Sequence, residues 1–270
     1  MTAIEIDGLS YNYHDGTAAI REIDLKIAKN RKVAILGANG SGKTTLLMHL
    51  NGLLLPQSGT VHIFGESVTK KNLRNIRQKV GILFDNPDNQ LFSTTVRDDV
   101  AFWPYNMDCN ESEIKRRTEL AIAAVGIGAL AEKPPHNLSL GQKKKAAIAG
   151  LLSMNLKLYA MDEPFSGLDP LSVGEFLAIL NELHGCGNTL VISTHDVDLA
   201  YAWAEDIIIL DQGQIAAAGG NEILHDNTML TKSRLCLPTL YKLFAETQFK
   251  PRTVQEAHEC ISRMAFSPRQ

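Results

Sequence analysis

The side chains best placed for chemistry lie in residues 37–44, which fit the phosphate-binding pattern G-x-x-x-x-G-K-[ST], or P-loop. Its glycines let backbone N–H groups converge on an anion at the start of a helix. Lys43 would then reach the β- and γ-phosphates of a nucleotide, and the Thr44 hydroxyl would hold Mg²⁺. The candidate nucleotide-binding residues in and beside this loop are Gly37, Asn39, Gly40, Ser41, Gly42, Lys43, Thr44 and Thr45.

The sequence on both sides of the P-loop has the layout that phosphate binding needs. Residues 33–36 read Val-Ala-Ile-Leu, which is typical of a short buried strand, and residues 45–50 read as the first turns of a helix. The structural alternative is a Gly-rich strand-to-helix turn that binds nothing. Because Lys and Thr stand at the required positions, phosphate binding is the better interpretation.

Two adjacent carboxylates end a second apolar run. Residues 156–161 read as a buried strand, and Asp162 and Glu163 follow it directly. Downstream of a P-loop, Asp162 can hold Mg²⁺ opposite Thr44, and Glu163 can polarise the water that attacks the γ-phosphate. Alone, Asp-Glu-Pro after an apolar run indicates a turn more often than an active site. Together with the P-loop, the pair is interpreted as catalytic.

A third segment, residues 137–142, opens a helix and has two interpretations. Ser139 and the Gly141 N–H can act as donors to an anion at the helix N-terminus. Ser139 and Gln142 also match a capping box, which is a purely structural role. Taken alone the segment favours the cap, whereas beside a P-loop and an acidic pair it favours anion binding.

Two further positions give weaker signals. His195 follows another apolar run, and ligands of parallel sheets bind beyond the carboxyl ends of the strands, so it can contact the γ-phosphate. A lone histidine there is more often a surface or core residue. Near the start of the chain, Tyr11 or Tyr13 can stack on a base, although an aromatic pair is more often packing.

Composition is that of an ordinary soluble globular protein. The chain has 270 residues, 44% of them hydrophobic and 21% charged, and its net charge of −3 leaves no basic footprint for nucleic acid. We expect no secretory signal, because the start lacks a charged-then-apolar leader. Residues 120–131 form an uncharged stretch that is too short to cross a bilayer. The cysteines form no CxxC pair, which predicts reduced thiols in a cytosolic protein.

The order of patterns predicts an α/β fold with an insert. Residues 1 to about 90 alternate short β-type runs with turns, and residues 95–152 are helical in pattern. Strand-type runs alternating with helical ones then return up to residue 210, as in βαβ units on a parallel sheet. We therefore expect one domain over residues 1–225 with a helical insert at about 95–152. A short helical C-terminal extension would follow over 226–270.

These motifs, in this order, resemble the ATP-binding-cassette (ABC) ATPases over roughly residues 3–225. The resemblance implies a P-loop NTPase fold, with a RecA-like parallel sheet core, an N-terminal antiparallel β subdomain and an inserted helical subdomain. That subdomain would carry the signature, Leu-Ser-Leu-Gly-Gln at 138–142. It further implies that ATP is sandwiched between two copies of the domain, the P-loop of one facing the signature of the other.

The resemblance also implies individual roles. Tyr13 would stack on adenine, Glu163 would be the catalytic base, and His195 would be the γ-phosphate switch. The loop Ser-Gly-Leu-Asp at 166–169 would link the two sites, and Asp169 in it would belong to the nucleotide-binding set. Ser139, Gly141 and Gln142 would bind the nucleotide held by the other subunit.

Several segments narrow the resemblance to the energy-coupling-factor ATPases, and within them to the cobalt/nickel-uptake branch. They are residues 84–92 (Phe-Asp-Asn-Pro-Asp-Asn-Gln-Leu-Phe), 98–102, 194–200 and, less specifically, 234–240. The branch implies ATP and Mg²⁺ as cofactors and a second ABC ATPase subunit, identical or paralogous. It also implies an integral-membrane coupling subunit and a separate substrate-binding membrane subunit. The chain would then work at the cytoplasmic face of the cell membrane, and the partners would handle the transported metal.

Three departures from the family pattern are visible. The family has Gln at the position of Asp85, where it contacts Mg²⁺ and the attacking water, so Asp85 becomes a candidate for catalysis and for the metal shell. The structural alternative is that Asp85 caps the following turn. Leu140 replaces the first glycine of the signature, and Trp103 stands where the branch usually has glycine. We expect a divergent but active member.

Other function classes fit less well. A small GTPase would need an N-K-x-D motif, a chromosome-structure ABC protein a long coiled coil, and a translation-type ABC protein two cassettes; the chain has none of these. Two alternatives stay open. The same machinery can import a vitamin, or the protein can be a nucleotide-gated assembly factor with little hydrolysis.

Overall fold

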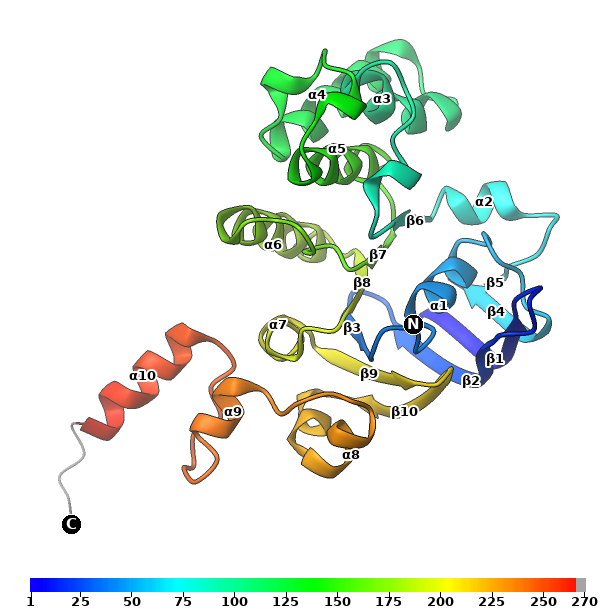
Figure 1. Cartoon of the computed structure of the whole chain (residues 1–270). Helices are drawn as coiled ribbons and strands as arrows, with labels where there is room; N and C mark the ends of the chain where they lie inside the picture. The colour runs from blue at the N-terminus through cyan, green and yellow to red at the C-terminus, as the bar shows by residue number, and fades with distance from the viewer. Residues whose placement is uncertain (266–270) are drawn as a thin grey trace.

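The computed structural model describes residues 1–265, within which the strands form two sheets (Figure 1). The central sheet has the order β10-β9-β3-β8-β7-β6, in which β10 runs antiparallel to β9 and the other neighbours are parallel. Its strands are β3 (Lys32–Leu36), β6 (Val80–Leu83), β7 (Leu158–Asp162), β8 (Thr189–Thr194), β9 (Asp206–Asp211) and β10 (Gln214–Gly219). Strands β7 and β8 are buried along their whole length, as expected for a parallel sheet that is covered on both faces.

The second sheet is antiparallel and has the order β2-β1-β4-β5. Its strands are β1 (Thr2–Asn12), β2 (Ala18–Ala28), β4 (Ser58–Ile63) and β5 (Glu66–Ser67). Helix α1 (Lys43–Leu50) shares one buried apolar cluster with this sheet and with one face of the central sheet. The prediction of short β-type runs is wrong for β1 and β2, which are eleven residues each; register shifts let this long pair stay together.

Three helices fill the segment where the sequence predicts a helical insert: α3 (Val96–Asn106), α4 (Glu111–Ala124) and α5 (Leu140–Ser153). Each begins at a polar N-cap, because the side chains of Thr95, Asn110 and Ser139 accept a backbone N–H of the first turn. Short elements complete this half of the chain: α2 (Leu73–Arg77) between β5 and β6, and the 3₁₀ turns η1 (Pro87–Asn89), η2 (Gly128–Leu130) and η3 (Pro135–Asn137).

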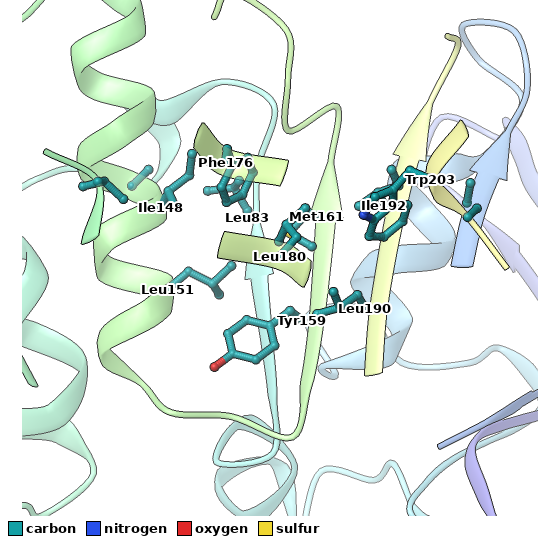
Figure 2. Packing of buried hydrophobic residues seen from close by; sticks show 14 of the residues in the cluster. Leu83, Ile148, Leu151, Tyr159, Met161, Phe176, Leu180, Leu190, Ile192 and Trp203 are labelled. Atoms are coloured by element: carbon teal, nitrogen blue, oxygen red, sulfur yellow. The ribbon is translucent and has the colours of Figure 1, made fainter. Parts of the chain in front are cut away.

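The other face of the central sheet packs against α5, α6 (Pro170–Gly185) and α7 (Val197–Trp203). Figure 2 shows Ile148 and Leu151 of α5 facing Tyr159 and Met161 of β7, so one core joins the helical insert to the sheet. The strands predicted at 33–36 and 156–161 are confirmed within a residue or two, as is the alternation of strands and helices that the sequence predicts up to residue 210.

Beyond the sheet the chain is helical, as the sequence predicts, with η4 (Asn221–His225), α8 (Asn227–Lys232), α9 (Thr239–Leu243) and α10 (Val254–Ala265). Two long-range contacts fasten this extension to α7. Asp198 accepts from the Thr239 N–H and hydroxyl, and Arg252 donates to the carbonyls of Tyr201 and Ala204. The last part of the expected extension, residues 266–270, lies outside the described residues.

None of the helices within residues 1–265 is both long enough and apolar enough to cross a bilayer.

Candidate active site

The P-loop connects β3 to α1, and its glycines are required by close approaches. A side chain at Gly37 would overlap the carbonyl oxygen of Leu210. Gly42 has φ +106° at the start of α1, and a Cβ there would come within 2.6 Å of the Ala19 carbonyl oxygen. The Ser41 hydroxyl oxygen is buried and has no hydrogen-bond partner in the described part of the chain, so it is free to bond a ligand in the loop.

Lys43 is folded into this loop. Its ammonium donates to the carbonyl oxygens of Gly37 (2.8 Å) and Ala38 (3.3 Å) and lies 3.9 Å from Glu163 Oε1. The side chain is 7% exposed, and this burial lowers the pKa of Lys43, while the charges of Glu163 and Asp162 oppose the shift. A buried cation is therefore held where a phosphate would meet the loop.

Asp162 joins the P-loop helix to the neighbouring strand. The Thr44 hydroxyl donates to Asp162 Oδ2 at 2.5 Å, and the Ser193 hydroxyl at the end of β8 donates to Oδ1. The structure thus brings together Thr44 and Asp162, two of the three residues that the sequence predicts as metal ligands. A carboxylate beside a hydroxyl is an all-oxygen set, which fits the ligand preference of Mg²⁺.

Glu163 lies at the centre of the cluster, one residue after β7. Its backbone has φ +43°, an uncommon conformation for a residue with a side chain, and its N–H donates to Ser193 O at 3.1 Å. The carboxylate is 16% exposed, and its Oε1 lies 3.0 Å from His195 Nδ1. The two predicted reactive side chains are therefore paired, with His195 itself 68% exposed.

Asp85 lies two residues beyond β6, with its carboxylate 55% exposed. Within residues 1–265 it makes no hydrogen bond to Thr44 or Asp162; Oδ1 lies instead 3.3 Å from the ammonium of Lys144. The interpretation of Asp85 as the cap of the following turn is wrong, because the Asn86 side chain accepts the Asp88 N–H at the start of η1. The place of Asp85 in the metal shell stays a prediction.

Lys144 is a buried residue that sequence reasoning missed. Its neighbours on both sides are lysines, and a run of three charged residues is more typical of a solvated face than of a buried one. The helical period could have shown its burial, because residues 144, 147, 148 and 151 share one face of α5. All four are buried. Burial lowers the pKa of Lys144, with the charge of Asp85 opposing the shift.

The signature lies at the start of α5, in the helical insert. Ser139 and Gln142 form the capping box: the Ser139 N–H donates to Gln142 Oε1 (3.1 Å), and the Gln142 N–H to Ser139 Oγ. Leu140 is 56% exposed, and a Cβ added at Gly141 would lie 3.5 Å from the carbonyl oxygen of Gly167. In Figure 1, α5 lies in the helical insert and α1 lies beside the antiparallel sheet, so the signature and the P-loop are on different parts of the molecule. Nucleotide binding by the signature stays a prediction.

Asp169 ends the loop 166–169 and caps α6. Its carboxylate accepts from the Ser172 N–H at 3.0 Å and from the Ser172 hydroxyl at 2.6 Å, and these hydrogen bonds lower the pKa of Asp169. Within the described residues, the carboxylate of Asp169 therefore serves as the cap of α6. A nucleotide contact of Asp169 stays a prediction.

Tyr13 borders the P-loop helix. Its hydroxyl lies 3.0 Å from Thr45 Oγ1, and its side chain is 37% exposed. Tyr11 packs edge-on against Tyr13 (5.3 Å between ring centroids) and against the buried ring of His49 (5.0 Å). Tyr11 therefore has the packing role, whereas Tyr13 keeps an exposed ring next to the site, as base stacking would need.

Comparisons with known proteins identify the family of the chain. The family model of ABC transporters matches residues 20–166. An energy-coupling factor transporter ATP-binding protein EcfA of Carboxydothermus hydrogenoformans is 44% identical, over 98% of this chain and 99% of its own length. The EcfA protein of Methanosphaera stadtmanae is also 44% identical, over 96% and 98% respectively.

Solved structures give the same result. CbiO1 of Clostridium perfringens, described as part of the ABC transporter complex cbiONQ, is 38% identical with a TM-score of 0.74; 90% of this chain and 99% of that one are covered. A dimeric ATP-binding cassette in a post-hydrolysis state with ADP and Pi is 26% identical with a TM-score of 0.75, covering 81% and 98%. The chain therefore belongs to the ABC transporter ATPases, as an ATP-binding subunit of the energy-coupling-factor type.

Proposed function

We propose that this ATPase binds ATP with Mg²⁺ and hydrolyses it to drive an energy-coupling-factor-type importer for cobalt or nickel ions. One observation carries the hydrolytic part of the proposal. The Glu163 carboxylate, paired with His195, lies beside the P-loop lysine and beside the oxygens of Thr44 and Asp162.

In this proposal, the residues of the P-loop bind the phosphates. The ammonium of Lys43 exchanges its bonds to the carbonyl oxygens of Gly37 and Ala38 for phosphate oxygens, and Ser41 Oγ offers a further polar contact. The ring of Tyr13 covers the base. When bound, Mg²⁺ neutralises charge on the phosphate oxygens; Thr44 and Asp162 hold it, with Asp85 as a further candidate.

In this proposal, Glu163 is the general base. A carboxylate in this place accepts a proton from the attacking water, and the contact with His195 Nδ1 fixes the orientation of the carboxylate. The exposed side of His195 is left to face the γ-phosphate. The intact pair opposes the alternative of a nucleotide-gated assembly factor with little hydrolysis.

The separation of signature and P-loop supports assembly with a second subunit. Because Ser139, Gly141 and Gln142 lie in the helical insert, we propose that they meet the nucleotide of a second ATPase subunit, identical or paralogous. The loop ending at Asp169 adjoins this signature through Gly167 and would connect the two sites. The dimeric state of a similar cassette with ADP and Pi supports this arrangement.

The membrane partners are proposed from the family. They are an integral-membrane coupling subunit and a substrate-binding membrane subunit, with the ATPase at the cytoplasmic face of the membrane. The resemblance of residues 84–92 to the cobalt/nickel-uptake branch supports cobalt or nickel as the substrate. A vitamin is the alternative cargo.

Uptake by the reconstituted complex tests the proposal. The ATPase and the membrane proteins encoded beside it are placed in proteoliposomes, and uptake of labelled cobalt, nickel and a panel of vitamins is measured with and without ATP. ATP-dependent uptake of cobalt or nickel is expected. Uptake of a vitamin but of neither metal ion would show that the vitamin is the substrate. ATP hydrolysis without uptake of any cargo would contradict the transport function.

A further inference from the structure

The side chain of Lys144 joins two strand ends of the active site. Its ammonium donates to the backbone oxygen of Glu163 at 2.7 Å and to that of Asp85 at 3.1 Å, and it lies 3.3 Å from Asp85 Oδ1. An ammonium has three protons to donate, so these acceptors can use all of them. The side chain is 1% exposed, which makes this arrangement a buried, fully bonded charge.

The acceptors lie just beyond the ends of two neighbouring parallel strands. Strands β6 and β7 pair in register up to Leu83 and Met161, and Asp85 and Glu163 follow them by two residues each. Lys144 comes from a different part of the chain, the signature helix α5. One side chain therefore ties the helical insert to both strand ends.

The bond to Glu163 acts on a strained residue. The left-handed backbone of Glu163 needs support on both sides of the residue. Ser193 O accepts its N–H at 3.1 Å, and the Lys144 ammonium and the Ser166 N–H (3.2 Å) donate to its carbonyl oxygen. The direction of the Glu163 carboxylate depends on this backbone geometry.

The charges at the same place are complementary. Asp85, Asp162 and Glu163 bring three carboxylates to a site that must also receive the phosphates of ATP. Lys144 and Lys43 offset part of this negative charge from inside the protein. The flanking lysines act elsewhere: Lys143 pairs with Asp88 and Lys145 with Glu175.

We propose that Lys144 is a positioning residue for ATP hydrolysis, which holds the backbone of Glu163 and couples it to Asp85. The proposal rests on the assignment of Glu163 as the base. A displacement of the segment that carries Asp85 is transmitted through the ammonium to the carboxylate that activates water. Lys144 itself does not contact ATP in this account.

Steady-state ATP hydrolysis and ATP binding by the full-length chain test it, with Lys145→Met as the matched control. Lys144→Met should lower kcat roughly tenfold or more, because a misplaced base loses rate without losing substrate, while the Kd for ATP keeps its wild-type value. Lys145→Met should leave both unchanged. A kcat equal to that of Lys145→Met, or a rise in Kd that matches the loss of kcat, would overturn the proposal.

Thermal denaturation checks whether Lys144→Met folds. Asp85 variants test the same coupling even if Lys144→Met does not fold. Asp85→Ala removes the side-chain acceptor of Lys144 and should lower kcat, whereas Asp85→Gln keeps an acceptor and should be faster than Asp85→Ala. The double variant Asp85→Ala/Lys144→Met should be no slower than Lys144→Met alone. Equal rates for the two Asp85 variants, or losses that multiply in the double variant, would contradict the coupling. Absence of hydrolysis in the wild-type chain and in Lys145→Met alike would instead overturn the proposed function.

Discussion

At the scale of single residues, the side chain of the P-loop lysine is almost fully buried. Lys43 is 7% exposed and bonds the carbonyl oxygens of Gly37 and Ala38. A cation in this position is desolvated before the nucleotide arrives, so less water has to be removed when its phosphates bind.

Lys43→Ala should therefore weaken ATP binding by roughly 10- to 100-fold, the range expected for losing hydrogen bonds to a charged group. Calorimetric titration with ATP measures the change, and Lys70→Ala, at an exposed position, serves as the control. An unchanged Kd for Lys43→Ala would reject the P-loop assignment.

The second residue-scale prediction concerns Asp85. Asp85→Gln removes one negative charge near the nucleotide and keeps an acceptor for Lys144, so basal hydrolysis should rise or its Mg²⁺ requirement fall, with ATP binding kept. Rates measured over a Mg²⁺ series check this. If basal rate, Mg²⁺ dependence and membrane-stimulated rate all match the wild type, Asp85 has no role in the chemistry.

At the scale of elements, the signature helix combines two roles at one end. Ser139 both caps α5 and carries the predicted contact to the partner's nucleotide. A variant there changes helix stability as well as assembly, and a control must separate the two effects.

Ser139→Arg should block ATP-driven dimer closure, because the bulky side chain enters the interface while the P-loop stays intact. Asn110→Arg is the control, since Asn110 caps α4 in the same helical insert and its loss costs a similar cap. Light scattering with ATP and Mg²⁺ measures closure. Normal closure by Ser139→Arg, or equal loss in Asn110→Arg, would defeat the sandwich arrangement.

The C-terminal extension makes a different prediction. Arg252 donates to the last carbonyls of α7, the helix that follows His195. Arg252→Ala should lower the free energy of unfolding by about 1.5–3 kcal/mol, the usual contribution of hydrogen bonds to a charged group. Thermal unfolding measures this change, with Lys242→Ala, at an exposed position, as the control. Equal melting temperatures of the two variants would show that the hydrogen bonds of Arg252 contribute nothing to stability.

These elements also show what the sequence can predict. The strands of the central sheet and the P-loop were predictable, because local apolar runs and one short motif determine them. Strand β10 (Gln214–Gly219) was missed since its alanine-rich sequence has little β-pattern, and its pairing with β9 determines the structure. The contacts of Thr239 and Arg252 with α7 join residues about 40 to 50 positions apart, and no local pattern encodes them.

At the scale of the whole molecule, catalytic and signature groups lie in different lobes. Glu163, Lys43 and Asp162 gather at the strand ends, whereas Ser139 and Gln142 cap a helix in the insert. One chain therefore carries the P-loop in one part of the fold and, in another, the signature that we propose binds the nucleotide of a second subunit. Hydrolysis and assembly should be separable by one substitution.

Glu163→Gln makes that separation, and its measurement tests the central claim most directly. ATP turnover, ATP affinity and dimer formation are followed in parallel for the wild type and the variant. The account predicts that turnover is abolished while binding is preserved and an ATP-bound dimer accumulates, because the base is lost and the phosphate cradle is intact. Hydrolysis by Glu163→Gln at a near wild-type rate would contradict it.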